Sequence, residues 1–284
     1  MILLDGKAIA KKIVTRIKAT NSESIVKTPH TLAILWIGND YATKKYVGIK
    51  KRVAKEVGLN VKIFHFSDST SKHALLNKLR ELNREDAIGG ILLQLPLPKT
   101  FNKFDIINAI DPHKDVDGLH PYNLGKVFNG DETYAPATPK GIIKLLEAYG
   151  IDVARKNCVI VGTSNIIGIP LTGMLLTRKA SVTALNINTP DISPYTKNAD
   201  ILISATGVPK LIGADMVKEG AVVVDCGIAK DPVSKKLCGD VDFEKVAPKC
   251  SYITPVPGGV GPMTVATLIQ STVEISALIG APKH

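Results

Sequence analysis

One lysine lies on the apolar side of a predicted helix over residues 41–57. Tyr46 belongs to an apolar stripe of that helix, and Lys50 falls only about 40° from it around the helix axis. The other members of the stripe are Ala42, Ile49, Val53 and Val57. Two interpretations remain open: the ammonium of Lys50 reaches water at the rim of the stripe, or it is partly desolvated. A desolvated amine has a lowered pKa and can act as a general acid or base near neutral pH.

Other polar residues also occur where polar residues are unusual. Gln94 interrupts the apolar run ILLQLPLP, a predicted strand end in which a buried amide needs hydrogen-bond partners. Asp115 and Asp117 are two residues apart in KDVDG, inside a segment, 111–123, that has no hydrophobic period and is predicted to be a loop. These acids could simply form a turn, with Gly118 adopting a positive φ angle.

A glycine turn follows the strand-like run NCVIV, residues 157–161, and leads into the apolar helical stretch PLTGMLL. Gly162 ends the strand and Gly168 opens the helix, where free backbone N–H groups and the helix dipole favour a phosphate. Ser164 adds a hydroxyl donor. The G-x5-G spacing differs from GxGxxG, and glycines at such turns are often only structural. The position of the turn, after the first strand of a predicted parallel sheet, favours a dinucleotide site.

The residue that separates NAD from NADP usually lies at the end of the following strand. In this chain that strand is SVTAL, and Asn186 follows it. Asn186 is neither an acid that could bind a ribose 2′-hydroxyl nor a base that could pair with a 2′-phosphate. The residues alone therefore leave the choice of cofactor open.

Apolar strand-like runs alternate with segments of helical period along the whole chain, which predicts an α/β fold with two domains. We expect the second domain to be a Rossmann-type doubly wound parallel sheet. Predicted strands cover 31–37, 61–66, 89–95, 157–161, 181–185, 199–205, 220–226 and 251–254, and predicted helices cover 7–18, 41–57, 72–83, 139–149 and 263–279. The segment 254–264, TPVPGGVGPMT, is too rich in Gly and Pro for a strand or helix and is predicted to be a rigid loop that lies against a flat ligand.

The composition narrows the possible partners. A net charge of +10 indicates either a solvated basic surface or attraction of an anionic small molecule, and no aromatic–basic pattern favours nucleic acid. The 4 cysteines form no CxxC pair and have no histidine at zinc-ligand spacing, which predicts a reducing compartment and no metal. No apolar run is long enough for a signal peptide or a membrane span, so we expect a cytoplasmic protein without a membrane partner.

Several segments occur together in the order and spacing of one protein family. They are YVGIKKRVAKEVG, LLQLPLP, KDVDGLHPYNLG, ATPKGIIKLL, VGTSNIIGIP, GAVVVDCGIA, GDVDF and ITPVPGGVGPMTVATL. Across essentially the whole chain they resemble the bifunctional methylenetetrahydrofolate dehydrogenase/methenyltetrahydrofolate cyclohydrolases. The resemblance implies NADP-dependent oxidation of 5,10-methylenetetrahydrofolate, NAD not excluded, and then hydrolysis of the methenyl product to 10-formyltetrahydrofolate. It also implies a homodimer.

The resemblance also implies the domains and the site residues. Residues 1–139 plus 267–284 would form the folate-binding catalytic domain, and 140–266 the dinucleotide-binding domain. Lys50 would be the general acid–base and Gln94 would tune it. The rest of the implied catalytic and folate-binding set is Tyr46 and Asp117, with Gly258, Gly259 and Pro262 as a folate-side loop. The implied cofactor-binding residues are Gly162, Thr163, Ser164, Gly168, Ile187 and Ile228.

The chain departs from the family pattern mainly at the cofactor positions. Thr163 stands where the family has the Arg of GRS, Asn186 and Ile187 replace the last residues of CHS, and Ala229 replaces the Asn of GIN beside Ile228. Two other functions therefore stay open: a cyclohydrolase with a degraded cofactor site, and a nucleotide-sensing module without catalysis. The intact set of Lys50, Gln94 and Asp117 argues against the second.

Overall fold

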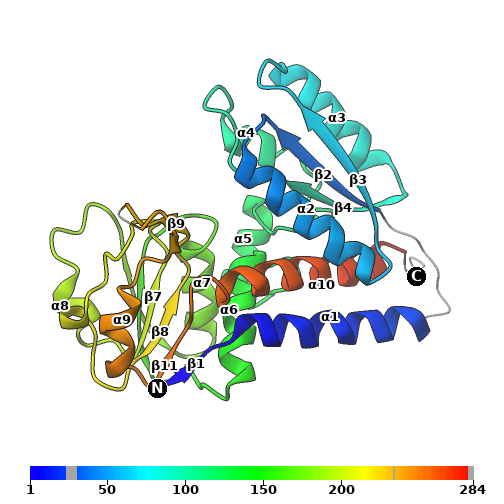
Figure 1. The fold of residues 1–284 in the computed structure, drawn as a ribbon. Helices are drawn as coiled ribbons and strands as arrows, with labels where there is room; N and C mark the ends of the chain where they lie inside the picture. Colours follow the sequence, from blue (N-terminus) through cyan, green and yellow to red (C-terminus); the bar gives the residue numbers. More distant parts are fainter. Residues whose placement is uncertain (24–30, 233, 281–284) are drawn as a thin grey trace. The chain divides into compact units, whose positions relative to one another are not determined.

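The computed structural model describes residues 1–23, 31–232 and 234–280, and the chain divides into two compact units (Figure 1). We call them the three-stranded unit and the six-stranded unit. The three-stranded unit comprises Lys11–Lys126, Thr133–Ala137 and Val265–His284. The six-stranded unit comprises Met1–Ala10, Val127–Glu132 and Thr138–Thr264. Four helices contribute residues to both units: α1 (Gly6–Glu23), α5 (Pro121–Phe128), α6 (Ala137–Ala148) and α10 (Val260–Gly280).

The three-stranded unit is built on a parallel sheet with the strand order β3-β2-β4. Its strands are β2 (Thr31–Ile37), β3 (Asn60–Phe66) and β4 (Ile88–Leu93). Every residue of β2 and β4 is buried, as expected for apolar parallel strands covered on both faces. The strands are linked through α2 (Tyr41–Glu56) and α3 (Lys72–Arg84), and the short helix α4 (Lys103–Ile107) follows β4.

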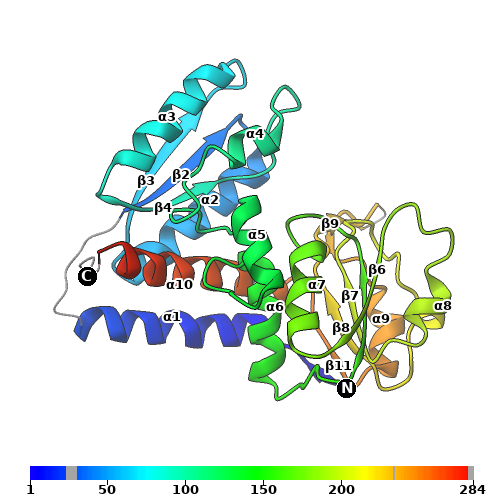
Figure 2. The ribbon, with the colours of Figure 1, turned by 180° about the vertical axis from the view of Figure 1, so that it is seen from behind.

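The six-stranded unit holds a parallel sheet (Figure 2). The order of its strands is β1-β11-β8-β7-β5-β6. Its strands are β1 (Ile2–Leu3), β5 (Asn157–Val161), β6 (Ser181–Leu185), β7 (Ile201–Ser204), β8 (Val222–Asp225) and β11 (Tyr252–Ile253). Its other elements are α7 (Gly168–Thr177), α8 (Ser193–Thr196), α9 (Phe243–Val246), the 3-10 turns Ala214–Met216 and Ala247–Lys249, and a hairpin of β9 (Ala229–Lys230) and β10 (Leu237–Cys238). Because β6 and β7 pair with opposite sides of β5, the topological switch point lies between β5 and β7.

The predicted two-domain α/β fold class is confirmed, but some element boundaries were wrong. α10 already begins at Val260, inside the predicted loop 254–264, and α5 begins at Pro121, inside the predicted loop 111–123. In both places a proline lies in the first turn of the helix, where its missing N–H leaves no helical hydrogen bond unmade. Proline therefore marked a helix start where we expected a loop.

The first strand was also missed. β1 is only two residues long, yet it pairs in parallel with β11, so the start of the chain extends the sheet formed by residues 157–253. A two-residue strand carries no period that a sequence pattern could reveal.

α10 is long and strongly apolar. Within the described residues it alone meets the length and composition of a membrane-spanning helix, with a mean hydropathy of 1.3 over Val260–Ile279. Its side chains Met263, Leu268 and Ile269 are fully buried in the structure, and a core helix of a soluble protein meets the same criterion.

Candidate active site

A buried lysine–amide pair lies in the three-stranded unit. The ammonium of Lys50, on α2, donates a hydrogen bond of 2.9 Å to Oε1 of Gln94, which directly follows β4. The amide Nε2 of Gln94 in turn donates to the carbonyl of Leu95 at 2.7 Å. Because a carbonyl can only accept, this second bond keeps the oxygen of the Gln94 amide facing the ammonium. Both Lys50 and Gln94 are 8% exposed.

The burial of α2 decides between the two interpretations of Lys50. Its ammonium is buried and does not reach water at the rim of the helix. The buried face consists of Thr43, Val47, Lys50 and Ala54, continued by Val57 directly after the helix, whereas Tyr46, Ile49 and Val53 are only partly buried. The apolar stripe is therefore rotated from the predicted one, although Lys50 belongs to both, and the side chain of Ala42 lies outside the described residues. Asp40 caps the start of α2 by accepting from the backbone N–H of Thr43 at 2.7 Å.

The electrostatics of the pair includes a nearby carboxylate, Asp117. Burial lowers the pKa of Lys50, and the negative charge of Asp117 partly offsets this. Burial likewise raises the pKa of Asp117 to about 6, against the opposing effect of Lys50 and with a further increase from Asp115. Both groups can thus exchange a proton nearer to neutral pH than an exposed lysine or aspartate can.

The loop that carries Asp117 is fastened to the edge of the sheet. Asp115 forms a parallel bridge with Ile91 of β4, and its carboxylate accepts from the backbone N–H groups of Gly118 at 3.0 Å and His120 at 2.8 Å. Gly118 has a φ of +67°, and a Cβ there would lie 2.3 Å from the carbonyl oxygen of Tyr134, so only glycine fits. The turn interpretation of the two aspartates therefore holds for Asp115, which leaves Asp117 as the chemically available acid.

Two further residues, which the sequence pattern does not single out, also hold this loop in place. The buried ammonium of Lys114 donates to the carbonyls of Leu82, Asn83 and Glu85 at 3.1, 2.8 and 3.0 Å, at the carboxyl end of α3. The Asn83 side chain accepts from the backbone N–H of Asp111 at 2.9 Å. A lysine next to Asp115 in a loop resembles an ordinary surface residue, so only its position in the KDVDG motif, beside the first acid and three residues before the second, Asp117, could have drawn attention to it.

The glycine turn of the six-stranded unit lies at the switch point of its sheet. Gly162 has a φ of +106°, and a Cβ on it would lie 2.4 Å from the carbonyl oxygen of Ala205, directly after β7. A Cβ on Gly168, the first residue of α7, would lie 2.0 Å from the carbonyl oxygen of Gly162. The residue before α7 makes no side-chain cap, and Ser164 accepts from the backbone N–H of Ile167 at 3.2 Å. The turn therefore has no room for a side chain at either glycine, and such a bare backbone at the start of a helix allows a phosphate to approach closely.

The other predicted cofactor residues lie on strands or loops at the same carboxyl edge. Ile187, after β6, is 98% exposed, and Ile228, after β8, is 49% exposed. Thr163 is partly buried beside Gly162, and Asn186 is exposed. Apolar side chains this exposed at the ligand-binding edge of a parallel sheet are suited to contact a flat ring.

The predicted folate-side loop belongs to the six-stranded unit. Gly258 has a φ of +122° and accepts from the backbone N–H of Lys7 at 2.9 Å. A Cβ on Gly259 would lie 2.7 Å from Cβ of Thr254, and Pro262 is in the first turn of α10. The structure therefore brings Tyr46, Lys50, Gln94 and Asp117 into one unit and places the loop residues in the other.

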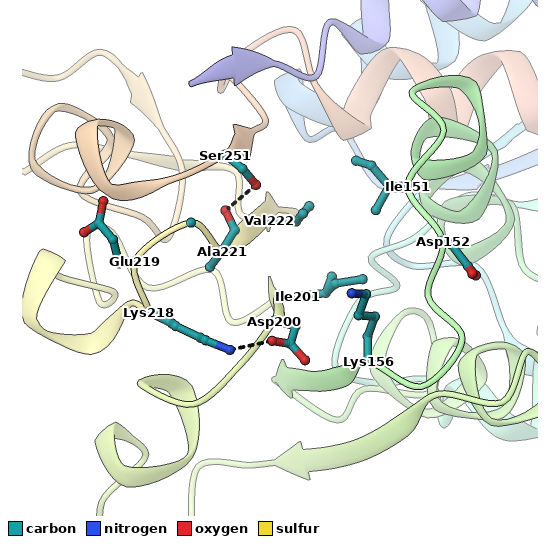
Figure 3. A pocket seen from close by; sticks show the side chains of 11 residues that line it. Ile151, Asp152, Lys156, Asp200, Ile201, Lys218, Glu219, Ala221, Val222 and Ser251 are labelled. Carbon is teal, nitrogen blue, oxygen red and sulfur yellow. Dashed lines mark hydrogen bonds and ion pairs between the residues drawn. The ribbon is translucent and has the colours of Figure 1, made fainter.

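A separate hollow of about 260 Å³ lies at the opposite edge of the six-stranded sheet (Figure 3). It is lined by residues at the amino ends of β7 and β8 and contains the ion pair of Lys218 and Asp200 at 2.6 Å. Ligands of parallel sheets bind at the carboxyl ends of the strands, and none of the predicted site residues lines this hollow.

Family models match most of the chain. The catalytic domain of tetrahydrofolate dehydrogenase/cyclohydrolase matches residues 4–117, and the NAD(P)-binding domain of the same family matches residues 136–278. The bifunctional protein FolD of Mesoplasma florum is 50% identical over 276 residues, which are 96% of this chain and 96% of that protein.

Solved structures agree with this match. The crystal structure of the bifunctional FolD dehydrogenase/cyclohydrolase from Campylobacter jejuni has a TM-score of 0.95 and 45% identity, covering 98% of this chain and 99% of that one. The Trypanosoma brucei N5,N10-methylenetetrahydrofolate dehydrogenase-cyclohydrolase, solved with NADP and an inhibitor, has a TM-score of 0.93 and 31% identity, covering 98% of each chain.

Proposed function

Because the chain belongs to the tetrahydrofolate dehydrogenase/cyclohydrolase family, we propose that Lys50 is the general acid–base of a bifunctional one-carbon folate enzyme. The enzyme oxidises 5,10-methylenetetrahydrofolate to 5,10-methenyltetrahydrofolate with NADP, and it then hydrolyses this product to 10-formyltetrahydrofolate. The observation that carries the assignment of Lys50 is its buried hydrogen bond to Gln94.

The hydrolysis defines what the lysine has to do. Water must lose a proton as it attacks the one-carbon unit, and a ring nitrogen must gain a proton as the ring opens. A neutral amine at Lys50 can accept the first proton, and the resulting ammonium can donate one to the ring nitrogen. The lowered pKa of Lys50 makes the neutral form accessible, and the Gln94 oxygen keeps Nζ in one position.

The remaining residues of the three-stranded unit would bind the folate. Asp117 carries its carboxyl on a loop fixed by Asp115 and Lys114, and it would hydrogen-bond the pterin ring. Tyr46, one helical turn before Lys50 and partly buried, would line the pocket. In the six-stranded unit, the turn at Gly258 and Gly259, together with Pro262, would form the folate-side loop.

The residues at the switch point fit a dinucleotide. Gly162 and Gly168 leave no room for a side chain, and Ser164 and the start of α7 would hold a phosphate. Ile187 and Ile228 would cover the flat rings, and Thr163 would lie near the ribose. When bound, NADP accepts the hydride that the one-carbon unit loses, and the two flanking nitrogens of the folate stabilise the resulting cation.

Three further assignments belong to the same proposal. The folate-binding domain would comprise residues 1–139 and 267–284, and the dinucleotide-binding domain residues 140–266. The enzyme would act in the cytoplasm on a small-molecule substrate, without nucleic acid or a membrane. It would form a homodimer through its cofactor domain.

One assay tests both activities. Methenyltetrahydrofolate absorbs light at wavelengths at which the methylene and formyl forms do not, so its appearance and decay report the two steps separately. With methylenetetrahydrofolate and NADP we expect it to form, and with methenyltetrahydrofolate alone we expect it to decay faster than without enzyme. Decay without NADP-dependent formation would reduce the function to a cyclohydrolase. The absence of both signals would refute the proposal.

A further inference from the structure

Two buried aspartates link the carboxyl ends of the central strands in the six-stranded unit. Asp225 is the last residue of β8 and is 3% exposed, and Asp240, in the GDVDF segment, is 0% exposed. Among the described residues neither carboxylate pairs with a cationic side chain. Both are bonded instead to the loops that leave β7 and β8.

Asp240 holds the end of β7. Its Oδ2 accepts from Oγ of Ser204 at 2.8 Å and from the backbone N–H of Thr206 at 2.6 Å. Ala205, between these two residues, is the one whose carbonyl oxygen lies against Gly162 in the glycine turn. Asp240 therefore sets the position of the backbone that closes the switch point between β5 and β7.

Asp225 holds the loop after β8 and the loop that carries Asp240. Its carboxylate accepts from the backbone N–H groups of Gly227 at 2.9 Å, Asp240 at 3.0 Å and Val241 at 2.9 Å. A Cβ on Gly227 would lie 2.0 Å from Oδ1 of Asp240, and a Cβ on Gly239 would lie 1.9 Å from Oδ2 of Asp225. Each carboxylate thus fills the space beside a glycine of the other's loop, and the two are interlocked.

We propose that Asp225 and Asp240 are positioning residues for the nicotinamide cofactor, and that they serve the oxidation but not the hydrolysis. This inference rests on the proposed function, because it assigns the switch point to NADP. The interlocked pair fixes the loops after β7 and β8, and one of these loops continues through Gly227 to Ile228. Lys50 and Gln94 belong to the other unit and bond to each other there, so we expect a reaction that needs no cofactor not to depend on the two aspartates.

Burying these two carboxylates costs free energy of folding, so stability alone does not account for them, and this supports a role in positioning. Burial raises the pKa of Asp225 to about 6, and the charge of Asp240 adds to the increase. Oδ1 of Asp240 is buried without a hydrogen-bond partner among the described residues. Two carboxylates in such surroundings cost desolvation energy that a neutral link between the loops would not.

The test compares Asp240→Ala with Asp200→Ala. Asp200 is a matched control because it precedes β7 at the opposite edge of the sheet, where it also accepts from one backbone N–H, that of Asn157. It likewise accepts from one side chain, that of Lys218 (Figure 3). For Asp240→Ala we expect the dissociation constant of NADP, measured by titration calorimetry without folate, to rise about tenfold. The dehydrogenase KM for NADP should rise by a similar factor, whereas the cyclohydrolase rate should stay within about twofold. Asp200→Ala should leave the dissociation constant and the KM for NADP unchanged.

A second variant keeps the test decisive if Asp240→Ala does not fold. Ser204→Ala removes one donor to Asp240 and little volume, and we expect a rise of about threefold in the NADP dissociation constant. Asp240→Asn keeps an acceptor oxygen for Ser204 and Thr206 and should recover most of the affinity that alanine loses. An unchanged NADP dissociation constant in Asp240→Ala or, if that variant is unfolded, in Ser204→Ala would overturn the inference, as would a parallel loss of both activities. Failure of the unmodified enzyme to oxidise its substrate with NADP would instead refute the proposed function.

Discussion

The side chains of Lys50 and Gln94 meet 2.9 Å apart in the interior of one unit, although 44 residues separate them in sequence. The helix supplies the amine and the strand end supplies the amide, so the geometry of the pair depends on how α2 packs over the sheet. An amine held by a neutral oxygen keeps a pKa that burial lowers, whereas a carboxylate in the same place would raise it.

Changing Gln94 should therefore move the pH dependence of the hydrolysis. In Gln94→Glu the ammonium of Lys50 gains a charged partner, so its pKa rises and the neutral amine becomes available only at higher pH. We expect the cyclohydrolase pH profile to shift upward by roughly 1–3 units, the usual effect of an opposite charge at this distance. Gln94→Ala should lower both activities because Nζ loses its fixed partner. Profiles of Gln94→Glu and the unmodified enzyme that coincide would show that another group titrates.

Asp117 should be a residue that reduces stability. Its pKa is raised to about 6 in the folded state, so the fold holds this proton more tightly than the unfolded chain does. The stability that protonated Asp117 contributes is fully present below about pH 4 and is lost as the pH rises through 6. Asp117→Asn cannot ionise and should raise the free energy of unfolding above pH 6 by up to about 3 kcal/mol, with little difference at pH 4. Urea unfolding at both pH values measures this.

A surface aspartate provides the control for that experiment. Asp105 forms an exposed ion pair with Lys72, and Asp105→Asn should change the free energy of unfolding by no more than about 1 kcal/mol at either pH. Asp117→Asn should at the same time weaken folate binding. If Asp117→Asn were less stable than the unmodified enzyme at pH 7, the argument that burial destabilises the charged Asp117 would be contradicted.

Two buried lysines allow a comparison of functional and structural charges. Lys114 donates to three backbone carbonyls, whereas Lys50 has one amide partner. Lys114→Met leaves three carbonyls at the end of α3 unpaired and should destabilise the fold by roughly 2–4 kcal/mol. Because Lys114 anchors the loop of Asp117, the folate KM should rise for both reactions. Lys50→Met should change the thermal unfolding midpoint far less, and equal losses in the two variants would contradict this distinction.

The sequence predicted best what depends on local periodicity. The strands at 31–37, 157–161 and 181–185 have the expected bounds, because apolar runs of that length between turn residues allow few alternatives. The helical period also placed Lys50 on the buried face of α2. It did not reveal which atom its ammonium meets, since that contact depends on a strand end 44 residues away.

The contacts that escaped prediction depend on tertiary structure. Lys114, Asp225 and Asp240 are buried charged residues whose partners are backbone groups of other elements, and nothing in a linear pattern separates them from surface residues. β1 is recognisable only through its pairing with β11. Prolines at the starts of α5 and α10 fit both a loop and a helix, and the packing of the following residues decided between them.

Thr163 should limit the affinity for NADP. No arginine stands beside Gly162 to pair with the 2′-phosphate, and Asn186 supplies no charge. Thr163→Arg should lower the NADP dissociation constant about tenfold, equivalent to about 1.4 kcal/mol, through a charge-assisted hydrogen bond. The NAD constant should stay the same, so titrating both cofactors provides an internal control. If the unmodified enzyme used NAD with a catalytic efficiency well above its efficiency with NADP, the expected preference for NADP would be wrong.

The strongest effect is expected for Lys50→Met, because the two reactions make different demands on the same amine. Loss of hydride requires chiefly that the one-carbon unit be positioned, and the folate nitrogens stabilise the cation that results. Hydrolysis requires a proton to leave water and another to reach a ring nitrogen, and methionine can move neither. We therefore expect the cyclohydrolase rate to fall by at least the roughly 10²–10⁴-fold typical of general acid–base catalysis. The dehydrogenase should fall less, through poorer orientation of the folate, and NADP binding should persist. Steady-state rates for both steps, measured beside an NADP titration that reports the integrity of the six-stranded unit, provide the test. Substantial cyclohydrolase activity in Lys50→Met would assign the proton transfers to another residue.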